Sequence, residues 1–190
     1  MNAASNIEYK INRLDEIVFM NNAWDGFALE NDAPELIDGK ILNRSLWDFI
    51  TGETTRQLYK DMLNLVRAGN VMRFNLDCAS PGKTRWMRMI ISPGEDDGAV
   101  FQTRALAVNE RLPQRILDRN AARTNRVIII CGWCKAIDTG IDGKKNWKNL
   151  AAGISLLGLF KQGKLPELSH GMCDDCYSAM SETLAQNNKK

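Results

Sequence analysis

The chain has 190 residues, of which 44% are hydrophobic and 25% charged, and its formal net charge is +2. A net charge this small does not by itself indicate a polyanionic partner. No apolar run approaches the roughly 18 residues of a membrane span, and the first residues lack the basic-then-apolar pattern of a secretory signal. We therefore expect a cytoplasmic protein with reduced thiols and no membrane partner.

Residues 1–108 have the pattern of an α+β domain. Two short strands are predicted at 7–11 and 16–20, a helix at 23–30, and a longer helix at about 55–68, where apolar residues recur at helical spacing. Alternating residues then predict three strands at 71–78, 84–91 and 99–106. Short turns separate these three strands, so we expect an antiparallel sheet.

Residues 109–126 are predicted to form a connector helix. Pro113 suits the first turn of a helix that runs to about Arg123. Arginines recur every four residues on one face of that helix: Arg111, Arg115, Arg119 and Arg123. Its only large apolar residues are Ile116 and Leu117, so we expect an exposed, solvated segment. An anionic partner or coiled pairing along the arginine face is the alternative.

Residues 127–190 are predicted to form a second, smaller module. The apolar run 127–131 predicts a buried strand. A helix is marked by Trp147, Leu150, Ile154 and Leu157, and it ends near Gly163. A last helix starts near Cys173 and carries Tyr177, Met180 and Leu184 on one side.

Two C-x-x-C pairs lie in this module and predict one metal site. Cys131 and Cys134 follow the strand in a tight turn that Gly132 eases, and Cys173 and Cys176 open the last helix, where residues three apart share a face. The helix N-terminus also favours thiolate over thiol. In a reducing compartment this arrangement indicates metal rather than disulfides, with unligated or redox-active thiols as the alternative.

Zinc is the metal we expect, because four thiolates saturate a tetrahedral structural site. Iron, or an iron–sulfur cluster, would use the same ligands and stays open. His170 is interpreted as a neighbour that donates a hydrogen bond to a ligand sulfur, with direct ligation as the alternative. If the site is structural, replacing Cys173 by Ser is expected to unfold residues 127–190 and leave the first domain largely folded.

The first domain resembles a PAS domain. Residues 17–24 (IVFMNNAW) are similar to the second PAS strand leaving for the first helix, and residues 42–50, including SLWDFI, are similar to the segment before the long helix. The tail, with its C-x-x-C and S-H-G-x-C-x-x-C motifs, looks like a cysteine module attached to bacterial sensor proteins. The resemblance implies a five-stranded antiparallel sheet with helices on one face, a sensory role, and often a ligand and a dimer.

Departures from the family limit the ligand that we expect. The flavin-photosensor cysteine motif is absent, and Cys78 is interpreted as a buried, inert thiol. No histidine occurs in residues 1–169, which excludes a histidine-ligated haem there, so neither flavin nor haem is expected. A small ligand would be held by aromatic side chains, whose alternative role is core packing: Trp24, Phe27, Trp47 and Trp86.

No catalytic motif stands out in a chain with one histidine and no phosphate-binding glycine loop. We therefore expect a non-enzymatic bacterial sensory or adaptor protein that signals through a protein partner, with a structural zinc site. A redox or metal sensor that uses iron is the first alternative. The second is a nucleic-acid-binding regulator that uses Arg115, Arg119, Arg123 and Arg126. Acidic Asp174, Asp175 and Glu182 on the last helix count against it.

Overall fold

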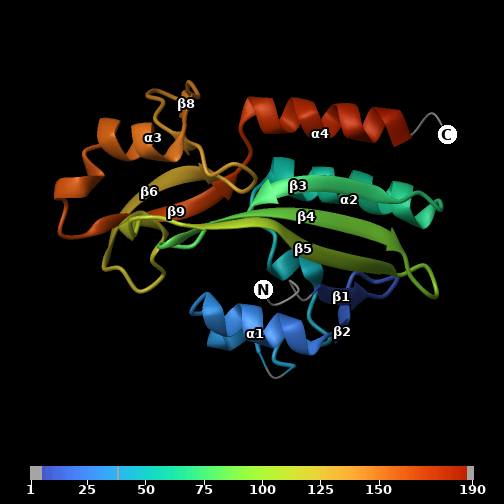
Figure 1. Ribbon diagram of the computed structural model, residues 1–190. Helices are drawn as coiled ribbons and strands as arrows, with labels where there is room; N and C mark the ends of the chain where they lie inside the picture. Colours follow the sequence, from blue (N-terminus) through green and yellow to red (C-terminus); the bar gives the residue numbers. More distant parts are fainter. Residues whose placement is uncertain (1–5, 38, 188–190) are drawn as a thin grey trace.

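The computed structural model describes residues 6–37 and 39–187, in which nine strands form two sheets (Figure 1). The first sheet has five strands in the order β2-β1-β5-β4-β3, and every neighbouring pair is antiparallel. Its strands are β1 (Ile7–Ile11), β2 (Ile17–Met20), β3 (Met72–Asp77), β4 (Lys83–Pro93) and β5 (Ala99–Glu110). The five strands and the antiparallel pairing predicted from the sequence are therefore confirmed.

Two helices lie between β2 and β3 in the chain. Helix α1 (Asn22–Glu30) begins where the Asn21 side chain accepts a hydrogen bond from the Trp24 backbone N–H, a typical N-cap. Helix α2 (Glu53–Arg67) buries the face that carries Leu58, Met62 and Val66. Short 3₁₀ turns at Pro34–Leu36 and Leu46–Asp48 fill the connection between the two helices.

Both helices cover the same face of the first sheet. Phe101 of β5 lies opposite Tyr9 of β1 and Ile91 of β4, so these side chains share a face. The Trp24 ring of α1 meets the Tyr9 ring edge-on at 5.4 Å, and Met62 of α2 belongs to the same buried cluster as Phe101. The predicted layer of helices on one face is therefore present.

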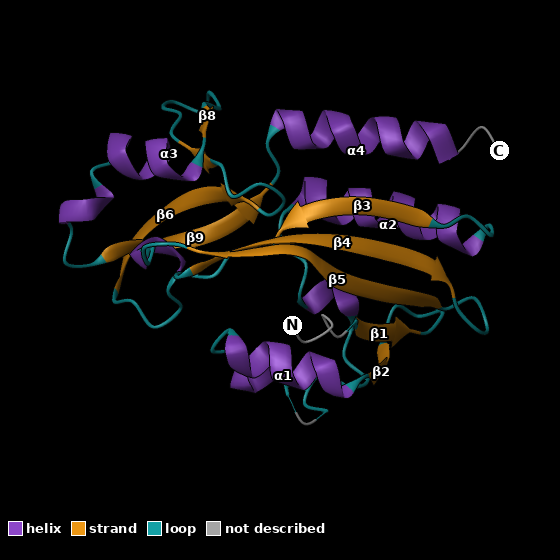
Figure 2. Ribbon diagram, in the orientation of Figure 1, coloured by secondary structure: helices purple, strands orange, loops and turns teal. Residues whose placement is uncertain are grey.

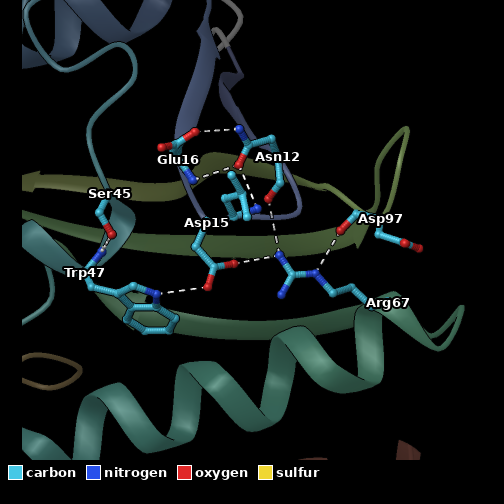
Figure 3. Close-up of polar contacts among 8 residues, drawn as sticks. Asn12, Asp15, Glu16, Ser45, Trp47, Arg67 and Asp97 are labelled. Atoms are coloured by element: carbon cyan, nitrogen blue, oxygen red, sulfur yellow. Dashed lines mark hydrogen bonds and ion pairs between the residues drawn. The ribbon is translucent and has the colours of Figure 1, made fainter.

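A polar network fixes the end of α2 to the turns around it (Figure 3). The Arg67 guanidinium lies 2.6 Å from a carboxylate oxygen of Asp15 and donates to the carbonyl oxygens of Asn12 and Asp97. The other Asp15 oxygen accepts a hydrogen bond of 2.9 Å from the Trp47 indole. Four segments that are distant in sequence are thereby joined at one corner of the domain.

The second sheet has the order β8-β7-β6-β9 and combines antiparallel and parallel pairing (Figure 2). Its strands are β6 (Arg123–Cys131), β7 (Ile137–Asp138), β8 (Trp147–Lys148) and β9 (Leu165–Gly171). Helix α3 (Leu150–Leu156) precedes a 3₁₀ turn at Leu159–Lys161, and α4 (Asp174–Asn187) ends the described chain. Strands β6 and β9 run parallel, with α3 in the crossover between them.

The predicted connector helix is wrong. Strand β5 continues to Glu110, a three-residue 3₁₀ turn occupies Arg115–Leu117, and β6 already begins at Arg123. Ile116, expected to be exposed, is only 2% exposed because it packs with Ile128 and Ile130 of β6. The segment is therefore part of the second sheet's core.

The arginines of this segment do not form one face either. Arg111 donates to the carbonyl oxygens of Pro81 and Ser80, whereas Arg119 pairs with Glu35 of the first domain. Each guanidinium thus binds a different part of the chain. None of the helices in the described residues is both long and apolar enough to cross a membrane.

Candidate metal centre

The two C-x-x-C pairs meet because β6 and β9 are parallel neighbours. Cys131 is the last residue of β6 and lies opposite Gly171, the last residue of β9. Parallel strands end at the same edge of a sheet, so the residues that follow them emerge side by side. Cys134 lies in the turn after β6, and Cys173 lies two residues after β9.

The first pair lies in a closed backbone turn. The Lys135 N–H donates to the Cys131 carbonyl at 3.0 Å, and the Cys131 N–H donates to the Ala136 carbonyl at 2.7 Å. Lys135 takes the left-handed conformation in this turn, with φ at 62°, whereas Gly132 does not. The Gly132 N–H instead donates to the Gly171 carbonyl at 2.9 Å, which ties this turn to the end of β9.

The second pair opens α4, as predicted. The Cys173 carbonyl accepts the Tyr177 N–H at 2.9 Å, which is the first turn of the helix, and Cys176 lies within that turn. The backbone N–H groups at a helix N-terminus carry a partial positive charge. Around Cys176, however, desolvation by burial and then the charge of the Cys131 sulfur outweigh this effect and raise the pKa of the Cys176 thiol to about 12.

The four sulfur atoms are close enough to share one ion. The Sγ atoms of Cys131, Cys134, Cys173 and Cys176 all lie within 4.8 Å of one another, and those of Cys134 and Cys173 are 3.6 Å apart. A tetrahedron with metal–sulfur bonds of about 2.3 Å has sulfur–sulfur edges of about 3.8 Å. The four cysteines could therefore hold a metal ion with little movement of the backbone.

Cys131 is the sulfur best prepared to be a thiolate. Hydrogen bonds from the Cys134 thiol, and then from the backbone N–H groups of Cys134, Cys173 and Trp133, lower the pKa of Cys131 to about 4 despite its burial. The Cys173 N–H lies 3.4 Å from this sulfur. Such donors stabilise a negative sulfur whether or not an ion is bound.

His170 lies in β9 beside Ile130 and is not part of the sulfur cluster. Its side chain is exposed, whereas Cys131 and Cys173 are buried. Four cysteines already supply the ligands of a tetrahedral site. Its role as a neighbour of the ligands stays a prediction.

Trp133, between the first two cysteines, connects the site to the first domain. Its carbonyl accepts the Asp77 N–H from the end of β3 at 2.6 Å. Its ring lies 6.0 Å from the Tyr59 ring of α2 and 6.2 Å from the Phe74 ring of β3. Trp133, Cys131 and Cys173 consequently belong to the same buried cluster as the core of the first domain. No pattern in the sequence predicts this contact.

The aromatic residues named for a ligand pocket lie in separate environments. The Trp24 indole donates to the Leu36 carbonyl, and the Trp47 indole donates to Asp15. The Phe27 ring lies 5.5 Å from the Arg85 guanidinium, and Trp86 is 47% exposed. Trp24 and Trp47 also pack against the core of the first domain.

Cys78 follows β3 and lies apart from the four-cysteine cluster. The thiol is partly buried, and desolvation raises its pKa above the ordinary value even though Lys135 and Arg85 act in the opposite direction. A raised pKa leaves the thiol protonated and a weak nucleophile at neutral pH. The burial predicted for Cys78 is thus only partial, and its inert role stays a prediction.

Comparison with known protein families finds no match, and comparison with curated proteins finds none either. Among solved structures, the PAS domain of Bordetella pertussis BvgS is similar over 53% of this chain and 72% of that one. The two are 14% identical, and the TM-score is 0.36. An overlap this loose does not establish a shared fold.

Proposed function

We propose that this chain is a sensory or adaptor protein that signals by binding a partner protein, without catalysis of its own. We further propose that Cys131, Cys134, Cys173 and Cys176 hold one structural zinc ion. The observation that carries the proposal is the cluster of four sulfurs at the ends of β6 and β9, joined to the core of the first domain through Trp133.

The site suits a structural zinc ion better than a catalytic metal ion. All four sulfurs lie within 4.8 Å of one another, and four protein ligands leave no open position for a substrate. The ion would supply folding energy by fixing the ends of β6 and β9 to the start of α4. The residues themselves contribute the thiolates and the N–H donors around Cys131.

The sensory role rests on the arrangement of the first domain. The five-stranded sheet with helices on one face is what the PAS resemblance implies. A signal in the first domain would then reach the cysteine module through the contacts of Trp133 with Tyr59 and Phe74. A small ligand and a homodimer are part of the same proposal.

Elemental analysis of the purified chain tests the metal. We expect one zinc per chain and no visible colour, and we expect Cys173→Ser to lose the zinc. Cys78→Ser is the matched control, because it removes a thiol that lies outside the cluster, and it should keep the full zinc content. Zinc retained by Cys173→Ser, or lost by Cys78→Ser, would contradict the assignment.

A redox or metal sensor is the second candidate, and one observation favours it. Cys134 is exposed, so an ion held there is within reach of small oxidants. Iron or an iron–sulfur cluster would give a coloured protein whose visible spectrum changes on reduction. A colourless protein with one zinc per chain removes this candidate.

Nucleic-acid binding has less support from the arginines than the sequence suggested. Arg115 donates to the carbonyl oxygens of Gln162 and Gly163, and Arg119 pairs with Glu35. Arg123 donates to three further carbonyl oxygens. Guanidinium groups that bind the chain itself are poorly placed to bind phosphates.

The adaptor role is tested by capture of partners from native lysate with the tagged full chain. Enrichment of a signalling protein, lost when a competing untagged chain is added, is the expected result. Recovery of no such protein, together with turnover of a metabolite by the purified chain, would mean that the chain is an enzyme.

A further inference from the structure

Helices α2 and α4 pack side by side (Figure 1). An open groove of about 430 Å³ lies between them. Helix α2 contributes Glu53, Thr54, Gln57, Leu58 and Asp61, and α4 contributes Tyr177, Ser181 and Leu184. Each helix therefore lines the groove with one face, at spacings of about one turn.

The groove is negatively charged. Glu53 and Asp61 are its only charged lining residues, and neither takes part in an ion pair among the described residues. The described side chains of α4 include acidic groups but no basic one. The basic residues of α2 are directed elsewhere: Arg56 to Trp47 and Ile50, Lys60 to Trp47, and Arg67 to Asp15.

The lining of the groove also includes three side chains that offer apolar surface: Leu58, Tyr177 and Leu184. Leu58 is buried, Leu184 packs against the core, and Tyr177 is 48% exposed. Tyrosine offers a large ring and a polar tip at low entropic cost, which makes it a common anchor in interfaces. Apolar surface beside two carboxylates suits an amphipathic ligand with basic flanks.

We propose that the α2–α4 groove docks a basic amphipathic helix of the partner protein, an inference that rests on the proposed adaptor function. A third helix laid along two others buries residues at i, i+3, i+4 and i+7. Its Lys or Arg side chains would meet Glu53 and Asp61. A second copy of this chain fits less well, because it would bring the same acidic α4 toward the groove.

The test uses a fluorescein-labelled synthetic peptide with leucines at i, i+3, i+4 and i+7 and lysines elsewhere. Its anisotropy is measured with the full chain at about 0.15 M salt, where exposed charges act over about 8 Å. We expect saturable binding that falls at least tenfold in Asp61→Lys and in Tyr177→Ala. A peptide of the same composition without helical period should bind at least tenfold more weakly.

Glu182→Lys is the matched control, because it makes the same charge change on α4 outside the lining of the groove. It should change the affinity less than threefold. An equal loss of peptide affinity in Glu182→Lys and Asp61→Lys would show that net charge alone attracts the peptide. Binding of the aperiodic peptide as tight as that of the helical peptide would show the same. Either result would overturn the proposal that the groove docks a helix. Circular dichroism and zinc content of each variant establish that the fold is kept. If Asp61→Lys does not fold, the peptide affinity of Tyr177→Ala alone tests the groove.

The two proposals fail in different ways. If wild type and Tyr177→Ala capture the same signalling protein equally well from lysate, the adaptor function stands and the groove is wrong. If the groove binds the peptide as described but wild type captures no signalling protein, the groove stands and the adaptor function is wrong.

Discussion

Gly98 lies where the turn between β4 and β5 passes the end of β1. A Cβ atom at this position would lie 2.4 Å from the Ile11 carbonyl oxygen and 2.8 Å from that of Glu95. Both are backbone atoms, so neither can move without shifting a strand or its turn. The absence of a side chain at Gly98 therefore allows this turn to approach β1 closely.

We predict that Gly98→Ala destabilises the protein by roughly 2–4 kcal/mol, because it forces an overlap inside a packed region. Gly26→Ala is the control: nothing lies within 4 Å of its Cβ position. It lies inside α1, where alanine should stabilise by about 0.5–1 kcal/mol. Urea unfolding of both variants measures the difference, and equal free energies of unfolding would contradict the clash.

Single residues also show what the sequence could and could not predict. The four-cysteine cluster was predictable because two C-x-x-C pairs stand out at the level of residue type and spacing. Trp133 was not, because its importance lies in contacts with Tyr59 and Phe74, which are distant in the chain. Lys135 was not either, because a left-handed φ at a lysine is set by the closed turn around it.

At the level of elements, local periodicity located the five strands of the first sheet, but the second sheet was largely missed. Its most extensively paired strands, β6 and β9, join residues about 40 positions apart, and β9 contains Pro166 and lacks alternation. The arginines spaced every four residues favoured a helix. Arg115 lies instead in a 3₁₀ turn and Arg123 in β6, whereas Arg111 and Arg119 lie outside both elements. Ile116 of the 3₁₀ turn is buried in the same cluster as Ile128 and Ile130 of β6.

Arg123 supports that arrangement and gives a prediction. Its guanidinium donates to the carbonyl oxygens of Pro166 in β9 and of Ile116 and Asp118 in the preceding turn. We expect Arg123→Ala to destabilise the protein by about 1–3 kcal/mol, since three charge-assisted hydrogen bonds are lost. The exposed Arg126 is the control, and Arg126→Ala should stay within about 0.5 kcal/mol of wild type. Equal shifts of the unfolding temperature in both variants would show that the hydrogen bonds of Arg123 contribute nothing to stability.

For the whole molecule, the shared core changes what is expected of metal loss. Cys131, Trp133, Cys173 and Met180 belong to the same buried cluster as Leu58, Phe74 and Phe101. Residues 127–190 were expected to unfold alone when Cys173 is replaced. The contacts across this cluster lead us to expect a loss of stability that reaches the first domain as well.

Two partly buried tyrosines packed against this cluster predict a loss of stability at high pH. Desolvation raises the pKa of Tyr59 to about 12 and, with the charge of Tyr59 as a further cause, raises the pKa of Tyr9 well above 10.0. Their phenols stay neutral in the fold but ionise near pH 10 in the unfolded chain. The stability they contribute is complete below pH 10 and is lost as the pH rises through the folded pKa values.

Tyr59→Phe isolates this effect, because it removes the ionisable group and keeps the ring. We expect the wild-type free energy of unfolding to fall between pH 10 and 12 by on the order of 2–3 kcal/mol more than that of Tyr59→Phe. Urea unfolding at each pH gives the two curves. Parallel curves over this range would mean that Tyr59 titrates normally.

The parallel pairing of β6 and β9 also has a consequence for the order in which the chain assembles. Cys131 and Cys173 are 42 residues apart, so bringing them together carries a loop-closure cost that local hairpins do not have. Cys131 and Cys134, in contrast, form a complete local pair as soon as the turn after β6 is synthesised. A zinc ion bound as we propose would therefore find only two of its four ligands until the crossover through α3 brings the second pair to the end of β6.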